Sequence, residues 1–413
     1  MSPAAQPPAG SPALRLLAGE GRVVRSRPRV VGRGLYLRAR GRTAWTLWPD
    51  EASPIQAVDV TAPESARFMR RSFHAPAPGR PLVDAARRLL DPRTWELGRS
   101  GALLEPASPG LARRALEHVL GDRLRDAAVI LFSPSGSELA KAVCFALEPG
   151  ASEPAAVVLA MADPRWSARL DHETALVERL RAQVAGAPSV EAALPLPPLG
   201  RFEPAGDLAV VARPDPLATL TGDAVAPDRG RAWRWLREFH AATTVRERTW
   251  TEEDAERTAR AVSEAWTTAS PAAERAAHGA VGATLPVCAV HGDFWRGNVA
   301  HDDRSLRVFD WEWGRPEGGP LFDVWTYEVS DAQFESHRPH DALVDRLTRA
   351  LERVRGELAV RGLDPSLAAA SLPGTVAELM NRFRRATGHP GAAEPGLVAL
   401  MAPIDEVLAL HGG

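Results

Sequence analysis

Residues 285–298 read Leu-Pro-Val-Cys-Ala-Val-His-Gly-Asp-Phe-Trp-Arg-Gly-Asn, and residues 305–314 read Ser-Leu-Arg-Val-Phe-Asp-Trp-Glu-Trp-Gly. The apolar run Val287–Val290 predicts a short buried strand, and the tight loop His291-Gly-Asp293 leaves its end because Gly permits the turn. Asn298 follows five residues after Asp293. A second apolar run, residues 306–309, predicts another strand that ends at Asp310. Two Asp side chains and one Asn are therefore expected to converge at the ends of neighbouring strands.

Such a set of side chains suits phosphoryl transfer from ATP. The phosphates carry several negative charges that Mg²⁺ neutralises, and Mg²⁺ prefers carboxylate and amide oxygens as ligands. A separate carboxylate must orient and deprotonate the attacking hydroxyl. In the protein-kinase template the loop H-R-D-x-x-x-x-N is followed by D-F-G. Here the loop is H-G-D-x-x-x-x-N, and the later motif is Phe309-Asp-Trp-Glu312.

These two motifs resemble those of the aminoglycoside phosphotransferase and choline kinase-like family of the protein-kinase-like superfamily. The resemblance covers residues 127–340, with C-terminal helices after them. It implies an α+β, bilobal protein-kinase-like fold. A small antiparallel-sheet N-lobe with one helix would precede a mostly helical C-lobe, and an N-terminal accessory region would come before both.

The resemblance also implies roles for residues at matching positions. Asp293 is expected to be the catalytic base, and Asn298 and Asp310 are expected to hold Mg²⁺. His291 would brace the loop, and Asp323 would anchor it.

In the N-lobe, the resemblance implies a nucleotide site. The small-residue turn 133–137 takes the place of the loop that covers the phosphates, and the strand 210–213 takes the place of the hinge that pairs with adenine. Glu173 lies on the helix whose Glu pairs with a strand lysine in this family. The expected nucleotide-binding residues are Lys141, Glu173, Ser135, Gly136, Ser137, Val211 and Arg213.

The sequence departs from the family at that strand lysine. The third strand, residues 156–161, contains no Lys, and the expected position holds Ala160. Lys141 lies on the second strand and is the single Lys among 50 basic residues, a bias typical of a GC-rich genome. Neighbouring strands are about 4.8 Å apart, a gap that a Lys side chain can span. A group of protein kinases, the WNK kinases, has a similar second-strand lysine. Two interpretations stay open: Lys141 replaces the missing lysine, or the protein is a pseudokinase.

The surrounding sequence predicts the order of elements. Strands are expected at 128–132, 139–147, 155–161 and 208–212, with a helix after Asp163-Pro164, and mostly helices beyond residue 230. We divide the chain into a disordered tail (1–13), a basic N-terminal accessory region (14–125), an N-lobe (126–213) and a C-lobe (214–413).

Composition excludes several classes of protein. In 413 residues, no apolar run reaches the roughly 18 residues of a membrane span. The N-terminus has no apolar core of the signal-peptide type, so a cytoplasmic protein is expected. Two cysteines are too few for a disulfide framework or a cysteine-based zinc site.

Charge divides the chain unevenly. Residues 1–125 contain 21 Arg and 11 Asp and Glu, a net charge of +10, whereas residues 126–413 have a net charge of −12. The basic part is either a solvated surface or a site for an anionic partner. Nucleic acid is not expected as that partner, because no base-stacking aromatics or groove-reading motif is evident.

We therefore expect an enzyme, an ATP- and Mg²⁺-dependent small-molecule kinase. Its acceptor would be a hydroxyl of an aminoglycoside, an amino alcohol, a sugar or a natural product. The alternative is a catalytically weak, nucleotide-binding pseudokinase that recruits an anionic partner through its basic N-terminal region. A third hypothesis is a metal-dependent hydrolase that uses His291, Asp293, His301 and Asp310.

Overall fold

The structure is a computed structural model that forms two compact units, Met1–Thr174 with Pro195–Val225, and Ala175–Leu194 with Ala226–Gly413. It describes residues 14–17, 21–25, 29–31, 34–36, 45–48, 56–59, 62, 64–65, 68, 102–106, 108–132, 141–161, 163–215, 229–266, 270–301, 306–387 and 394–411.

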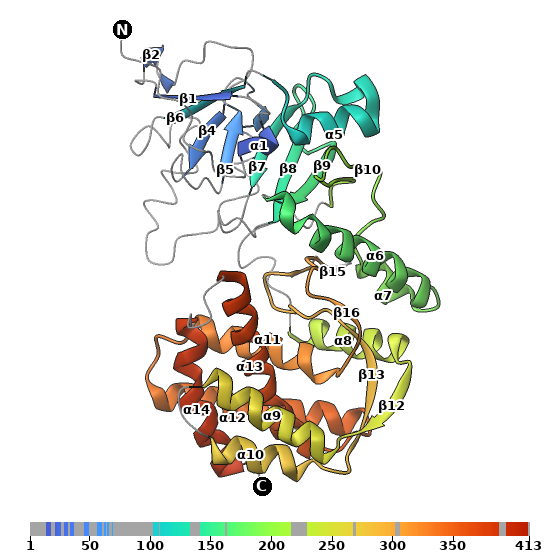
Figure 1. The fold of residues 1–413 in the computed structure, drawn as a ribbon, viewed down its shortest axis with the longest axis vertical. Coiled ribbons are helices and arrows are strands. Elements are labelled where there is room, and N and C mark those ends of the chain that lie inside the picture. The colour runs from blue at the N-terminus through green and yellow to red at the C-terminus, as the bar shows by residue number, and fades with distance from the viewer. Residues whose placement is uncertain are drawn as a thin grey trace. The chain divides into compact units, whose positions relative to one another are not determined.

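The first unit is built on one antiparallel sheet in the order β1-β6-β4-β5-β7-β8-β9-β11-β10 (Figure 1). Strand β5 pairs with β7, so strands from both sides of residue 125 share this sheet. The strands are β1 (Gly21–Arg25), β4 (Trp45–Trp48), β5 (Gln56–Asp59), β6 (Ala102–Pro106), β7 (Ala128–Phe132), β8 (Lys141–Leu147), β9 (Ala156–Met161), β10 (Gly200–Phe202) and β11 (Ala209–Ala212). A separate hairpin joins β2 (Arg29–Val31) to β3 (Gly34–Tyr36).

Side chains alternate across this sheet, and each face has its own core. Helices α1 (Leu14–Leu17) and α5 (Leu111–Leu120) cover the face that carries Cys144, Val158 and Ala160. The opposite face carries Phe145 and Val157, packed against Phe68. The N-lobe was predicted with one helix, but α5 covers this sheet as well.

The predicted helix after the third strand is present. The Asp163 side chain accepts a hydrogen bond from the backbone of Arg165 and caps a 3-10 turn, which leads into α6 (Ser167–Gln183). Near its start, Leu170 packs with Met161 and Val210 of the sheet. Helix α6 therefore lies on the face away from α5.

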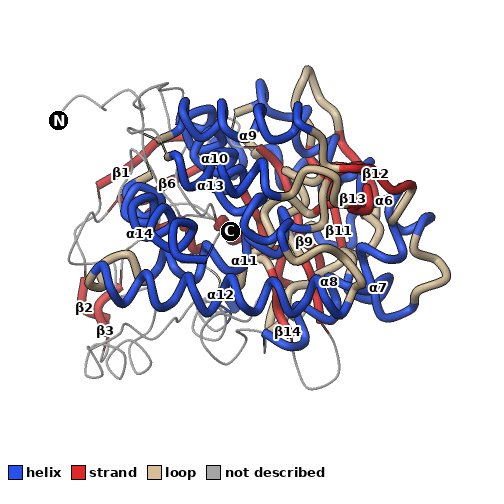
Figure 2. The backbone as a smooth tube through the Cα atoms, turned by 90° about the horizontal axis from the view of Figure 1, so that it is seen from below, coloured by secondary structure: helices blue, strands red, loops and turns tan. Residues whose placement is uncertain are grey.

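Helices dominate the second unit (Figure 2). They are α7 (Pro188–Ala193), α8 (Arg229–Thr243), α9 (Glu252–Ala265), α10 (Pro271–Gly279), α11 (Leu321–Phe334), α12 (His340–Val360), α13 (Ser366–Thr387) and α14 (Pro395–His411). Its strands are short: β12 (Arg246–Thr249), β13 (Thr284–Val290) and β16 (Arg315–Gly318) form one sheet, and β14 (Val299–His301) pairs with β15 (Leu306–Val308).

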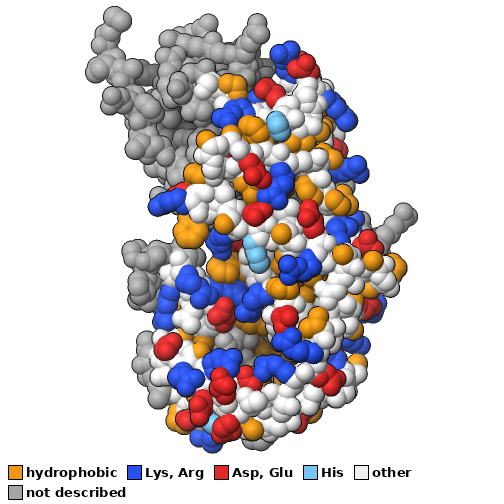
Figure 3. All heavy atoms as spheres, turned by 45° about the vertical axis from the view of Figure 1, so that its right-hand side comes forward, with side chains coloured by type: hydrophobic (Ala, Val, Ile, Leu, Met, Phe, Trp, Pro, Cys, Tyr) orange, Lys and Arg blue, Asp and Glu red, His pale blue; other side chains and the backbone are white. Residues whose placement is uncertain are grey.

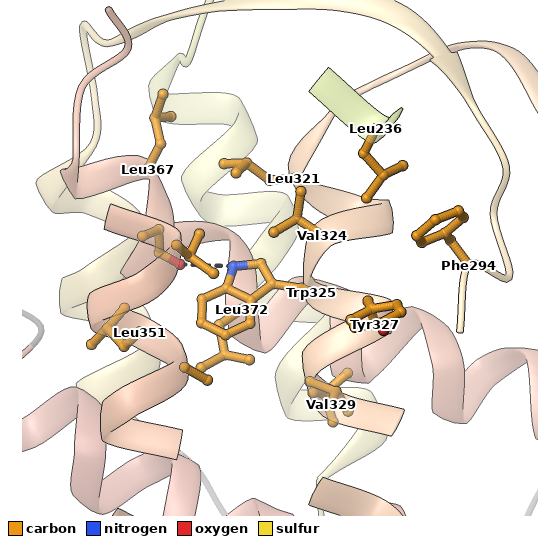
Figure 4. Packing of buried hydrophobic residues seen from close by; sticks show 14 of the residues in the cluster. Leu236, Phe294, Leu321, Val324, Trp325, Tyr327, Val329, Leu351, Leu367 and Leu372 are labelled. Carbon is orange, nitrogen blue, oxygen red and sulfur yellow. Dashed lines mark hydrogen bonds between the residues drawn. The ribbon is translucent and has the colours of Figure 1, made fainter. Parts of the chain in front are cut away.

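Trp325 of α11 lies at the centre of this helical core, close to Leu351 and Leu372 (Figure 4). Its indole N–H donates to the carbonyl of Ala368 and to the hydroxyl of Ser371, both at 3.1 Å. The aromatic ring is thus buried without leaving its one donor unsatisfied, which ties α11 to α13.

The α+β class and the predicted order of elements are confirmed. The second strand spans Lys141–Leu147, and helix α10 lies within the part of the chain predicted to be mostly helical. The segment Pro81–Leu90, whose sequence also predicts a short helix, lies outside the described residues, as do the tail 1–13 and the turn 133–137.

Among the described helices, none is long and apolar enough to cross a membrane. On the face drawn in Figure 3, the acidic and basic side chains of the described residues are interspersed.

Candidate active site

The loop after β13 is shaped by a glycine that no other residue can replace. Gly292 has a φ of +83°, a conformation that side chains disfavour. A Cβ at this position would lie 2.2 Å from the carbonyl oxygen of Trp313. The backbone therefore turns sharply between His291 and Asp293.

His291 braces this loop with both ring nitrogens. Its Nδ1 accepts from the backbone N–H of Asp293 at 3.2 Å, so its proton lies on Nε2, which donates to the carbonyl of Phe309 at 2.7 Å. The ring is buried against Trp311, with centroids 4.5 Å apart. These contacts hold the two motifs together, and they leave no ring nitrogen for a metal ion.

Asn298 holds the Asp293 side chain in place. Its Nδ2 donates to Oδ2 of Asp293 at 2.8 Å and to the Asp293 carbonyl at 3.0 Å. The backbone carbonyl of Asn298 accepts from the N–H of Phe309 at 2.8 Å. Both amide hydrogens of Asn298 are thus directed at Asp293, and its side-chain oxygen is left to offer to a metal ion.

Asp310 is the next residue after Phe309, whose N–H donates to the Asn298 carbonyl. Its φ is +63°, one of two such non-glycine values among the described residues. A left-handed conformation costs about 1 kcal/mol, and Asp is one of the few side chains that adopt it readily. Burial, and then the charge of Asp310, raise the pKa of Asp293, while His291, Arg382 and the Asn298 hydrogen bond oppose them. Like charges near each other are typical of a cation site.

Asp323, at the start of α11, binds the backbone of the loop at His291 and Gly292. Its two carboxylate oxygens accept from the backbone N–H groups of His291 and Gly292, both at 2.8 Å. Burial alone would raise the pKa of this carboxyl, but the hydrogen bond from His240 and the contacts with His291 hold it below its usual range. The anchoring geometry predicted for Asp323 is therefore observed.

Sequence reasoning missed His240 of α8, which lies behind Asp323. Its Nδ1 accepts from Arg361 at 3.1 Å, so its Nε2–H faces Asp323 at 3.5 Å. Arg361 also contacts Glu357, which accepts two hydrogen bonds from Arg237. A lone His within a helical pattern gives no signal of this network. Arg382 of α13, which donates to the Gly292 carbonyl, was missed as well.

In the first unit, the structure joins Lys141 to Glu173. The Lys141 Nζ lies 3.0 Å from Oε1 and 2.8 Å from Oε2 of Glu173, and both side chains are largely buried. The single lysine of the chain therefore joins strand β8 to helix α6 through an ion pair. An ammonium held in this way is a preorganised donor for phosphate oxygens.

Ala160 does not occupy the place of the family's third-strand lysine. It pairs with Ala142 and points into the core under α5, whereas Lys141 is opposite Met161 on the other face. The prediction that Ala160 holds the place of this lysine is wrong by one residue. Because successive side chains of a strand point to opposite faces of the sheet, a shift of one residue moves the side chain to the other face.

Val211 lies inside the sheet, between β9 and β10, and its carbonyl accepts from the N–H of Leu199 at 2.7 Å. Its prediction as an adenine-pairing residue is wrong because both of its neighbours are strands. Arg213 is exposed, just beyond the end of β11. Ser135, Gly136 and Ser137 fall outside the described residues.

Whether the site in the second unit suits Mg²⁺ depends on which side chains there could coordinate a metal ion. Among the residues described, no group of three or more His, Cys, Asp or Glu could hold a metal ion. Asn298 and Asp310 would offer an amide oxygen and a carboxylate, a small set that suits Mg²⁺ when phosphates and water complete its shell. The site therefore fits a metal that arrives with a nucleotide better than a hydrolase's resident metal.

No protein-family model matches the chain, and no curated protein matches it. Among solved structures it is similar to a thermostable mutant of aminoglycoside phosphotransferase APH(4)-Ia in ternary complex with ADP and hygromycin B. That match has 15% identity and a TM-score of 0.41, and covers 72% of this chain and 99% of that one. A glucosamine kinase matches at 15% identity and a TM-score of 0.37, over 98% of both chains. Amicoumacin kinase hAmiN, in complex with AMP-PNP, Ca²⁺ and Ami, matches at 11% and 0.34, over 69% of this chain and 86% of its own.

Proposed function

We propose that this protein is an ATP- and Mg²⁺-dependent kinase that transfers the γ-phosphate to a hydroxyl of a small molecule. The observation that carries the proposal is the junction of the two motifs, where Asn298 fixes Asp293 at 2.8 Å and its backbone leads to Asp310 through Phe309. A base, an amide oxygen and a second carboxylate are the groups that this reaction requires.

Each residue has a distinct role in this mechanism. Asp293 accepts a hydrogen bond from the acceptor hydroxyl, orients it and takes its proton as the new O–P bond forms. The bond between the γ-phosphorus and the β–γ bridging oxygen breaks in the same transfer, and ADP is the leaving group. Asn298 and His291 keep that carboxylate and its backbone in place. Asn298 and Asp310 would hold Mg²⁺, which neutralises phosphate charge when bound.

Lys141 supplies the cation for the nucleotide's phosphates. Its pairing with Glu173 fixes the position of the ammonium. This ion pair supports an active kinase over the pseudokinase hypothesis, because the missing third-strand lysine was the reason for doubting activity. The proposed acceptor is a small molecule with a hydroxyl group. That the basic N-terminal region binds an anionic partner is a separate proposal.

The test is ADP release from Mg-ATP across a panel of aminoglycosides, amino alcohols and sugars. Acceptor-dependent turnover in the wild type that disappears in Asp293→Ala supports the kinase. Binding of Mg-ATP without turnover on any acceptor would favour the pseudokinase, and a requirement for a transition metal without nucleotide would favour the hydrolase.

A further inference from the structure

The loop of this protein lacks a charged residue that the protein-kinase loop carries. Between His and Asp, H-R-D places an arginine, whereas this chain has Gly292. The structure explains why, since a Cβ at residue 292 would collide with the Trp313 carbonyl. No arginine can occupy this position without rebuilding the turn.

A guanidinium reaches the same peptide from another element. Arg382, on α13 and 90 residues along the chain, donates from a terminal nitrogen to the carbonyl of Gly292. Only 8% of its side chain is exposed. We propose that Arg382 is a positioning residue for catalysis, which fixes the peptide that carries Asp293.

The surroundings of Arg382 show a preorganised side chain. Its guanidinium carbon lies 5.0 Å from the ring centre of Trp313 and 4.7 Å from that of Phe322. Its Nε donates to Glu378, one turn earlier on α13, at 3.1 Å. Two aromatic faces and one carboxylate fix both the plane and the direction of the donor.

The peptide between Gly292 and Asp293 is then held at both of its polar atoms. Arg382 binds its oxygen, and His291 Nδ1 accepts its N–H. Because a peptide is planar, fixing these two atoms fixes the direction in which the Asp293 side chain leaves the backbone. An error of about 1 Å in a reacting group can lower the rate about a hundredfold.

This inference rests on the proposed function, so its test includes a readout that needs no turnover. The variants are Arg382→Ala and Arg382→Lys, with Arg385→Ala as the matched control. Arg385 also contacts Glu378, at 3.3 Å, but is exposed. ADP release gives kcat and the KM for Mg-ATP, and hydrogen exchange measures the protection of the backbone amides at residues 291–294.

We expect Arg382→Ala to lower kcat about a hundredfold while the KM for Mg-ATP changes less than about threefold. Arg382→Lys, which keeps a charged donor, should recover at least about tenfold of that loss. Added guanidinium should raise the kcat of Arg382→Ala and leave Arg385→Ala unchanged. The amides of the loop should exchange faster in Arg382→Ala alone.

A kcat within twofold of the wild type in Arg382→Ala would overturn the proposal. So would losses in kcat, KM and melting temperature together that neither lysine nor guanidinium rescues, because that result indicates a structural role only. If Arg382→Ala does not fold, Arg382→Lys still decides through the same measurements. If the wild type has no turnover, the proposed function fails, and unchanged amide exchange in the loop would then reject the role of Arg382 separately.

Discussion

Lys141 in the first unit and Asp293 in the second are held in position by different kinds of contact. Lys141 forms an ion pair with Glu173, which joins a strand to a helix. The Asp293 loop is held by Asp323 of α11 and Arg382 of α13, as well as by its own His and Asn, and His240 of α8 lies behind Asp323.

The difference follows from what each group must do. An ammonium that attracts phosphate charge acts over several ångströms, because Coulomb energy falls slowly with distance. A general base must meet one hydroxyl within hydrogen-bond reach, so its position is critical. We therefore expect the second region to be the more sensitive to substitution, and the following experiments test that comparison.

The largest effect is expected for Asp293→Asn, which keeps the shape of the side chain and removes the base. The kcat for ADP release should fall by about 10³–10⁴, because proton transfer and orientation are both lost. The affinity for Mg-ATP, measured by calorimetry, should change by no more than a few fold. A turnover within tenfold of the wild type would show that another group is the base.

A smaller effect is expected for Lys141→Ala. Its kcat/KM for Mg-ATP should fall about a hundredfold, since one cation at the phosphates is removed. Moving the lysine sharpens the test: Met161→Lys, added to Lys141→Ala, should restore at least about tenfold, because residue 161 lies opposite on the same face.

The matched control for that relocation is Ala160→Lys in the same background. It should restore nothing and should lower the free energy of unfolding by several kcal/mol, because Ala160 points into the core under α5. Recovery of activity by lysine at 160 would contradict the strand register, and unchanged kinetics in Lys141→Ala would contradict the role of Lys141.

Asp323→Asn tests the anchor of the loop. We expect a loss of about 2–4 kcal/mol in unfolding free energy, because two backbone N–H groups and His240 lose a charged acceptor. The folded pKa of Asp323 is lowered, so its contribution is complete above the ordinary Asp value of about 3.9 and is lost as pH falls through the folded value.

Thermal unfolding between pH 7 and pH 3 should therefore show a shallower loss of stability on acidification in Asp323→Asn than in the wild type. The exposed Glu253, replaced by Gln, serves as the control and should leave both stability and slope unchanged. An Asp323→Asn protein with the wild-type slope would show that other carboxylates carry the acid sensitivity.

The smallest effect is a gain in stability from Asp293→Asn. The pKa of this carboxyl is raised in the fold, so its contribution favours folding below the unfolded pKa and is lost as pH rises through the folded value. At neutral pH the charged group destabilises the protein, and the variant should be more stable by about 1 kcal/mol. The gain should vanish near pH 3 in thermal melts. No difference at pH 7 would mean that the loop's partners fully offset the burial of this charge.

Much of the fold could be predicted from the sequence because it is determined locally. The alternating and short apolar runs marked β7, β8, β9, β11 and β13 within a few residues, and Asp163-Pro164 marked the start of a helix. Helix α10 was expected only as part of a mostly helical stretch, because its buried face consists of small Ala side chains, which give a weaker pattern than Leu or Val. The boundary near residue 125 stays a prediction, although one sheet joins strands from both sides of it.

The sequence by itself determined which groups share the loop after β13. Asp293 and Asn298 are five residues apart, and a glycine turn with that spacing brings an amide to a carboxylate whatever surrounds it. It also pointed to Lys141, through composition, and to Glu173. The tertiary structure decided the rest: which face of β9 lies under α5, that Lys141 meets Glu173, and that Arg382 reaches Gly292. Those contacts join residues 32 to 90 positions apart, and only the packing of helices and sheet determines which distant side chains meet.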